Sequence, residues 1–349
     1  MTADDRRAFA TDRQVQAAHT ALKKAQWITA AMALRAIARP SGAERPVRFQ
    51  PKAPPAPKGF LRQAWLEAFE KDAADVAAGV YPPMADRPAE PRFGPRAAVD
   101  LLADALDVEA RRRRRGGAEV RADAPRAYPT YYRQNFHYQS GGWFTSESAR
   151  RYENQVEALF VGAAGAMRRR ALSLLARAWR ERDHRGLAIV DLACGSGAFL
   201  ENLVRTFPRA RLAGVDLSPP YLAESRRRSG VGALAVANAE RLPFADSSLD
   251  AVTCIYLFHE LPPRVRPLVA AEIARVLKPG GYLAFADSIQ PCDEPRLERM
   301  LEAFPAYFHE PFYGSYSRTD VPALFADAGL RVAGQDRAFL TKALLLEKP

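Results

Sequence analysis

The chain has 349 residues, of which 48% are hydrophobic, so it is long enough for a large buried core and for more than one domain. Its three cysteines show no metal-ligand spacing, and they exclude a disulfide-rich scaffold. The formal net charge of +11 divides into +6 for residues 1–125, +6 for residues 126–185 and −1 for residues 186–349, which argues against a phosphate-binding cleft in the C-terminal part.

Residues 1–125 are predicted to form a mainly helical extension that prolines interrupt. Residues 12–39 and 60–78 have the apolar spacing of amphipathic helices. The prolines from Pro40 to Pro57 exclude one continuous helix between them. The longest apolar stretch of this region, residues 27–38, is broken by polar and charged side chains, so no membrane span is expected. Near the N-terminus no continuous apolar core precedes a cleavage site, and we therefore expect a cytoplasmic protein.

Residues 126–185 are predicted to contain an aromatic lid followed by helices that lead into the core. The segment 128–144 holds six tyrosine or phenylalanine residues, a tryptophan and a histidine beside two glycines. Such side chains stack on apolar or planar ligands, which makes Tyr132 and His137 candidate catalytic residues. The alternative interpretation is a structural loop that joins the N-terminal region to the core.

A glycine turn between a strand and a helix is the strongest motif of residues 186–349. The apolar run that begins at Ile189 leads into Gly195 and Gly197, and a second apolar run ends at Asp216. Glycines let the backbone approach a ligand, and the acid at the end of the second strand accepts from ribose hydroxyls. A dinucleotide site would need a third glycine where Leu200 stands. S-Adenosylmethionine, which has a ribose but no pyrophosphate, fits this pattern better.

Three further strands and their connections follow in the expected order. Strands are predicted at residues 233–237, 251–256 and 282–287. A helix is predicted to end near Lys278, because Pro279 and the two glycines after it cannot continue it.

These pieces resemble the class I S-adenosylmethionine-dependent methyltransferases. The matching stretches are VDLACGSG, GVDLSPPYL, ANAERLPFADSSLDAV and EIARVLKPGGYLAFAD, with a weaker upstream likeness in RYEN and MRRRAL. The resemblance covers roughly residues 145–349 and is nearest to the branch of the ubiquinone and menaquinone C-methyltransferases. It implies a doubly wound, Rossmann-like α/β sheet of seven strands that ends in an antiparallel hairpin, residues 330–336 and 338–347. The family usually has glycine at Ala193 and aspartate at Asn238.

The resemblance also implies which residues bind the cofactor, and it implies no metal. The cofactor-binding residues expected from it are Asp191, Ala193, Gly195, Gly197, Asp216, Leu217, Asn238, Ala239, Ile255 and Tyr256.

Methyl transfer needs an aligned acceptor, and it needs a base only if the acceptor arrives protonated. His259 follows the fourth strand, where the methyl group is expected, and we predict that it faces the cavity. The alternative is that His259 caps the next loop. The aromatic residues from Phe304 to Tyr316 are a further candidate wall of the acceptor site.

The sequence therefore predicts a methyltransferase that uses S-adenosylmethionine and acts on a small-molecule acceptor with aromatic or lipid-like character. One alternative is an RNA or protein methyltransferase that docks its substrate on the basic N-terminal region, although a nucleic-acid partner is disfavoured by the neutral core. Another alternative is a scaffold that binds the cofactor without turnover.

Overall fold

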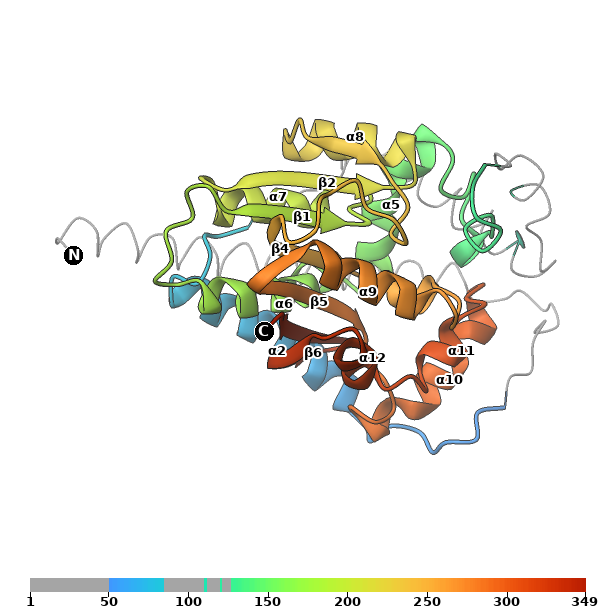
Figure 1. Ribbon diagram of the computed structural model, residues 1–349. Helices are drawn as coiled ribbons and strands as arrows, with labels where there is room; N and C mark the ends of the chain where they lie inside the picture. The colour runs from blue at the N-terminus through green and yellow to red at the C-terminus, as the bar shows by residue number, and fades with distance from the viewer. Residues whose placement is uncertain (1–49, 85–109, 112–119, 121–126) are drawn as a thin grey trace, which may run out of the picture.

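A computed structural model describes residues 50–84, 110–111, 120 and 127–349, and its centre is a seven-stranded sheet with helices on both faces (Figure 1). The strands are β1 (Ala188–Leu192), β2 (Arg211–Asp216), β3 (Leu234–Val236), β4 (Leu249–Ile255), β5 (Leu277–Ser288), β6 (Arg331–Ala338) and β7 (Thr341–Glu347). The α-helices are α2 (Phe60–Ala77), α5 (Ser146–Leu159), α6 (Ala164–Ala178), α7 (Ala198–Thr206), α8 (Pro219–Ser229), α9 (Arg266–Val276), α10 (Glu298–Tyr307), α11 (Tyr313–Tyr316) and α12 (Val321–Asp327). Within the described residues there are also short 3₁₀ helices, η1 (Phe136–Tyr138), η2 (Phe258–Glu260) and η3 (Pro295–Leu297).

The strand order β3-β2-β1-β4-β5-β7-β6 confirms the predicted doubly wound sheet and its terminal hairpin. Strands β1, β2, β3, β4 and β5 pair with their neighbours in parallel, whereas β7 is antiparallel to both β5 and β6. The chain moves outward from β1 to β3 and then crosses back to β4, so β1 is the switch point between the two halves. Loops leave the neighbouring carboxyl ends of β1 and β4 in opposite directions there, which opens a crevice suited to a ligand.

Two apolar layers cover the sheet because successive side chains of a strand point to opposite faces. In β1, Val190 packs in the layer that α9 and α12 complete, whereas Ile189 packs with α6 and α7. Both side chains are about 1% exposed, which accounts for the continuous apolar run in the sequence.

Strand β5 begins earlier than predicted. The preceding helix, α9, ends at Val276 rather than near Lys278, and the Pro279–Gly281 segment belongs to the strand. The cause is pairing with the C-terminal end of the chain: the Gly280 N–H donates to the Lys348 carbonyl at 2.7 Å, and the Lys348 N–H donates to Gly281 at 3.0 Å.

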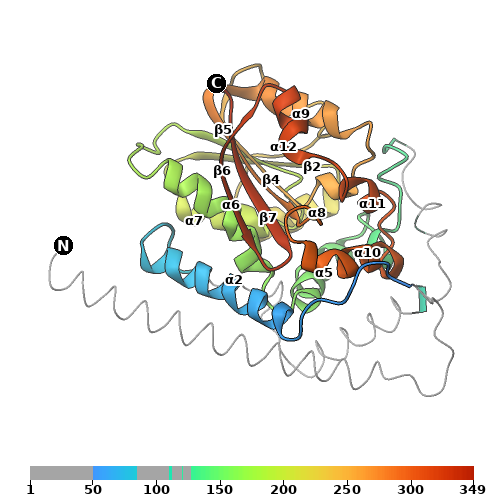
Figure 2. The same ribbon diagram turned by 90° about the horizontal axis from the view of Figure 1, so that it is seen from below.

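The predicted helix at residues 60–78 is confirmed as α2, whereas the predicted helix at residues 12–39 lies outside the described residues. Figure 2 shows α2 alongside α6, and buried charges join the two. Asp72 of α2 accepts from Arg169 of α6 at 2.6 and 2.8 Å and from the Tyr81 hydroxyl at 2.8 Å. All three side chains are buried, so α2 is part of the core packing. Over the described ranges, no helix is both long and apolar enough to cross a membrane.

Replacing Asp72 with alanine should destabilise the fold strongly, because it leaves the Arg169 guanidinium buried without its carboxylate. The loss of one partner of a buried ion pair typically costs about 3–5 kcal/mol. Urea denaturation of D72A and of E70A, a change at an exposed site on the same helix, measures the effect. We expect E70A to stay within about 0.5 kcal/mol of the wild type. Equal midpoints for the two variants would contradict a stabilising contact between α2 and α6.

Candidate active site

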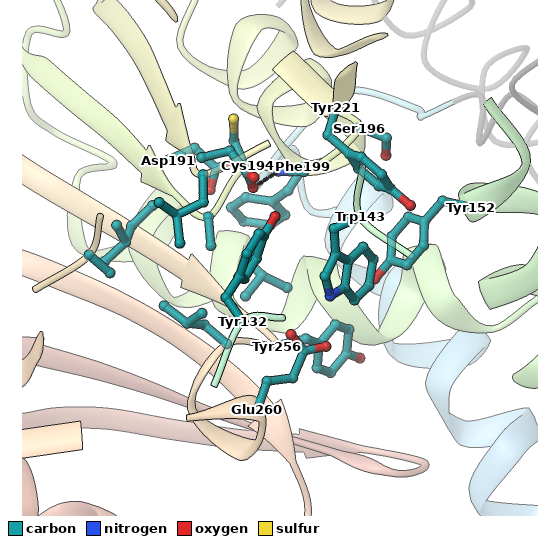
Figure 3. A pocket seen from close by; sticks show the side chains of 18 of the residues that line it. Tyr132, Trp143, Tyr152, Asp191, Cys194, Ser196, Phe199, Tyr221, Tyr256 and Glu260 are labelled. Carbon is teal, nitrogen blue, oxygen red and sulfur yellow. Dashed lines mark hydrogen bonds between the residues drawn. The ribbon is translucent and has the colours of Figure 1, made fainter. Parts of the chain in front are cut away.

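A cavity lies beyond the carboxyl ends of β1, β2 and β4, as the switch point requires (Figure 3). Every predicted cofactor residue except Gly197 lines it. These lining residues are Asp191, Ala193, Gly195, Asp216, Leu217, Asn238, Ala239, Ile255 and Tyr256. Their roles in binding stay predictions, but the chain brings them to one place.

The glycine turn after β1 contains two glycines with different surroundings. Gly195 lines the cavity at φ 50°, and a Cβ built on it would meet Tyr221 at 4.0 Å. Gly197 has φ 81° and does not itself line the cavity, and a Cβ on it would be 2.7 Å from the Cα of Ser225 in α8. Gly197 therefore allows α7 to begin close against α8, and its part in cofactor binding stays a prediction. Ala193 also has a left-handed backbone, φ 55°, so glycine at this position of the family has a physical reason.

Asp216 is a half-buried carboxylate whose two oxygens each accept a backbone N–H. Gly195 donates to Oδ2 at 2.9 Å and Ser218 donates to Oδ1 at 2.8 Å. Burial raises the pKa of Asp216 to about 6, although both N–H groups act in the opposite direction. Each oxygen retains a second lone pair for a ribose hydroxyl. The carboxylate is therefore held in place for a ligand by the protein itself.

Asp191 offers a second test of fit to the cofactor. Its Oδ1 accepts from the Thr253 hydroxyl at 2.6 Å, whereas Oδ2 is buried and has no hydrogen-bond partner among the described residues. Burial raises the pKa of Asp191 to about 7. A buried oxygen at the cavity wall without a donor suits a cationic ligand group. The ammonium of the methionine part of S-adenosylmethionine is such a group, so this wall fits the cofactor.

Arg168 and Glu153 line the cavity and were missed as site residues in the sequence. Arg168 of α6 donates to Glu153 of α5 at 2.6 Å, and the Ser196 hydroxyl donates to the same carboxylate at 2.7 Å. Burial alone would raise the pKa of Glu153, but Arg168 and Arg228 hold it below its usual value. The upstream RYEN and MRRRAL likeness was the signal for these residues. The pair ties both lead-in helices to the glycine turn.

The predicted lid segment lies against the cavity. Four of its aromatic residues are in the wall: Tyr131, Tyr132, Phe136 and Trp143. Polar contacts hold the segment on α8, since the Ser218 hydroxyl donates to the Trp143 carbonyl and the Gln139 amide donates to Tyr221 at 2.6 Å. Tyr132 thus lies where the prediction required, whereas its role in catalysis stays a prediction.

The two histidine candidates, His137 and His259, do not line the cavity. The Nδ1 atom of His259 lies 2.6 Å from Asp287, and the ring is nearly buried. Burial alone would lower the pKa of His259, but Asp287 raises it to about 10. The structure thus turns His259 toward Asp287 rather than into the cavity, contrary to its predicted position, and this arrangement gives no support to a role as a base. The Asp287 carboxylate also accepts from the backbone N–H of His259, which fixes the turn after β4.

Comparisons with known proteins agree with the sheet and the glycine turn. A family model described as a methyltransferase domain matches residues 190–285. The chain is 35% identical over 127 residues to a fatty-acid O-methyltransferase of Mycolicibacterium smegmatis, covering 36% of this chain and 46% of that protein. It is 37% identical over 142 residues to a demethylmenaquinone methyltransferase of Thermus thermophilus, covering 40% and 61%. The chain thus spans about half the length of the curated relatives it matches.

Among solved structures, the chain is similar to the magnesium protoporphyrin IX methyltransferase of Synechocystis PCC 6803 with bound S-adenosylhomocysteine. The two are 16% identical with a TM-score of 0.43, and the match covers 54% of this chain and 85% of that one. The family match over residues 190–285 and the strand order identify this part of the chain as a class I methyltransferase domain. S-Adenosylmethionine is the cofactor of such a domain. The chain is also 33% identical over 153 residues to a ubiquinone/menaquinone biosynthesis C-methyltransferase of Desulfotalea psychrophila, covering 43% of this chain and 54% of that protein.

Binding of S-adenosylhomocysteine should weaken at acidic pH. The carboxylate form of Asp216 accepts from the ribose, and this form is lost as the pH falls through about 6. We expect the affinity, measured by calorimetry, to decline as the pH falls through about 6, in addition to any decline that Asp191 contributes near pH 7. D216N should bind at least tenfold more weakly at pH 7.5, because a hydrogen bond to a charged group contributes about 1.5–3 kcal/mol. A decline of the same size in D216N would assign the pH dependence to another group, such as Asp191.

The two glycines of the turn should respond differently to alanine. G197A forces a methyl group into the backbone of Ser225, so α7 must move and S-adenosylhomocysteine binding should fall at least tenfold. G195A makes only an ordinary contact with Tyr221 at 4.0 Å within the protein and carries the left-handed backbone strain, about 1–2 kcal/mol, so its effect on binding should be smaller. A thermal-shift titration of both variants checks this order. Equal ligand responses would show that the contact between α7 and α8 does not shape the site.

Proposed function

We propose that the chain transfers the methyl group of S-adenosylmethionine to a small-molecule acceptor with aromatic or lipid-like character. The observation that carries this proposal is the aromatic wall of the cavity. Tyr132, Phe136 and Trp143 line the site from the lid, and Tyr152 of α5 and Tyr256 after β4 add to it. Stacked rings favour planar or apolar ligands over a hydrated phosphodiester chain.

The residues around the cavity divide the work of binding. Asp216 takes the ribose hydroxyls, and Asn238, which lines the same cavity, is the proposed partner of the adenine edge. Asp191 takes the ammonium of the methionine part, and the Arg168–Glu153 pair lines the same cavity. The cofactor, when bound, supplies a methyl group on a positively charged sulfur. The lid excludes water and aligns the acceptor, which is most of what such a displacement needs.

The named relatives support the same acceptor class. One is a fatty-acid O-methyltransferase and another is a demethylmenaquinone methyltransferase, so their acceptors are lipid-like or carry a quinone ring. The match covers less than two thirds of each relative, so the aromatic side chains of the cavity are the main support for the acceptor class.

Tritiated-methyl S-adenosylmethionine tests the proposal directly. The full chain is incubated with a metabolite extract, with RNA and with a protein fraction, and incorporated label is counted in each. We expect label in the organic-soluble metabolite fraction, and little with D216N as the control.

The other outcomes assign other functions. Label in RNA or protein would favour docking on the basic N-terminal region. No label in any fraction, together with normal S-adenosylhomocysteine binding, would identify a scaffold without turnover.

A further inference from the structure

Glu260, the residue after His259, faces the cavity. It ends η2, the short helix that follows β4, and it lies in the wall near Tyr132 and Tyr256 (Figure 3). The 3₁₀ turn directs neighbouring side chains to different sides, so His259 packs against Asp287 while Glu260 reaches the cavity. The turn after β4 therefore brings the carboxylate of Glu260, and not the imidazole of His259, to the cavity wall.

Behind Glu260 lie His137 of the lid and Glu310 of the segment between α10 and α11. Nε2 of His137 is 3.0 Å from Oε1 of Glu310 and 3.9 Å from Oε1 of Glu260. The Glu310 side chain has no exposed surface, and Phe304 and Phe308 flank the His137 ring. One imidazole thus lies between two carboxylates, at the contact of two aromatic segments that were predicted separately.

The charges of this cluster support each other. Burial alone would lower the pKa of His137, but Glu310 and Glu260 raise it above its usual value. Burial raises the pKa of Glu310 to about 7, and the two histidines oppose that shift. An imidazolium at His137 therefore stabilises carboxylate charge beside the cavity.

Other ionisable groups also face this carboxylate. The titratable groups that interact with Glu260 come from the lid, α5, β2, η2 and the segment after α10, and they are Tyr132, His137, Tyr152, Asp216, His259 and Glu310.

We propose that Glu260 is the catalytic base that takes a proton from the acceptor, and that His137 and Glu310 position it. The inference rests on the proposed function and names its acceptor class: an uncharged group that must lose a proton, such as a phenolic or enolic hydroxyl or an activated carbon acid. A carboxylic acid is already ionised at neutral pH and needs no base, and its charge would meet the carboxylate of Glu260.

The step balances with the groups named. The acceptor's O–H or C–H bond breaks, its proton goes to a Glu260 oxygen, and its electron pair forms the bond to the methyl carbon. The carbon–sulfur bond breaks with both electrons left on sulfur, which becomes a neutral thioether. The proton then leaves Glu260 for water, so one proton is released for each methyl group transferred.

The test compares E260Q, E260D and H137Q with E298Q, a control at an exposed glutamate on α10. The probe is the metabolite extract with tritiated cofactor, followed from pH 5.5 to 9. E260Q should transfer at least 100-fold more slowly, since general bases typically contribute about 10²–10⁴-fold. Its S-adenosylhomocysteine affinity should stay within about twofold of the wild type, and E260D should recover part of the rate. H137Q should change the pH profile as well as the rate, which loss of packing alone would not do.

Two readouts do not depend on the rate. NMR titration should show a lower pKa for His137 in E260Q than in the wild type, with no change in E298Q. The labelled product should also survive mild alkali, because ethers and C-methyl groups are stable where methyl esters release volatile methanol.

Several outcomes overturn the assignment alone. The first is that E260Q transfers the methyl group as fast as the wild-type chain. The second is that the pKa of His137 is the same in E260Q as in the wild type. The third is that mild alkali releases the label from the product as methanol. If the wild-type chain transfers no methyl group, the proposed function is refuted, and so is the assignment of Glu260 as its catalytic base.

Discussion

The site depends on one half-buried carboxylate, Asp216, at the end of β2. A charge partly removed from water must be compensated by hydrogen bonds, and here the donors are backbone N–H groups of Gly195 and Ser218. These bonds join the turn after β1 to the start of α8. The Ser218 hydroxyl in turn donates to the Trp143 carbonyl of the lid. The acid that suits the ribose therefore also fixes two walls of the cavity, and cofactor recognition is coupled to lid position through a single side chain.

The acceptor side is held by a different set of contacts. Residues 128–144 and 304–316 were predicted as separate candidate walls, but they meet at His137, whose backbone N–H donates to the His309 carbonyl and whose ring pairs with Glu310. His137 has φ 56°, a left-handed conformation that a histidine adopts only where its surroundings hold it. The lid is thus anchored on α8 at one end and on the segment after α10 at the other.

Local patterns made the fold and half of the site predictable. The buried strands, the glycine turn and Asp216 can be read from short stretches because each depends on neighbours in the sequence. Gly197 could not be assigned this way, since its role depends on Ser225 of another helix. Likewise α2 was predicted as a helix, but its pairing with Arg169 joins residues 97 positions apart. The choice between His259 and Glu260 depends on the geometry of one 3₁₀ turn, which composition does not reveal.

The net charge counted along the sequence also does not predict the negative electrostatic potential inside the cavity. The C-terminal part is nearly neutral overall, yet Asp191, Asp216 and Glu260 line the cavity, and the Arg168 charge is already matched by Glu153. A negatively charged cavity wall attracts S-adenosylmethionine, which carries ammonium and sulfonium charges. It interacts less with S-adenosylhomocysteine, whose sulfur is a neutral thioether. The same field opposes anionic acceptors, whether phosphodiesters or carboxylates. Under the proposed function, the carboxylates that bind the methyl donor would also restrict which acceptors can approach it, so cofactor binding and acceptor selection would share one electrostatic cause.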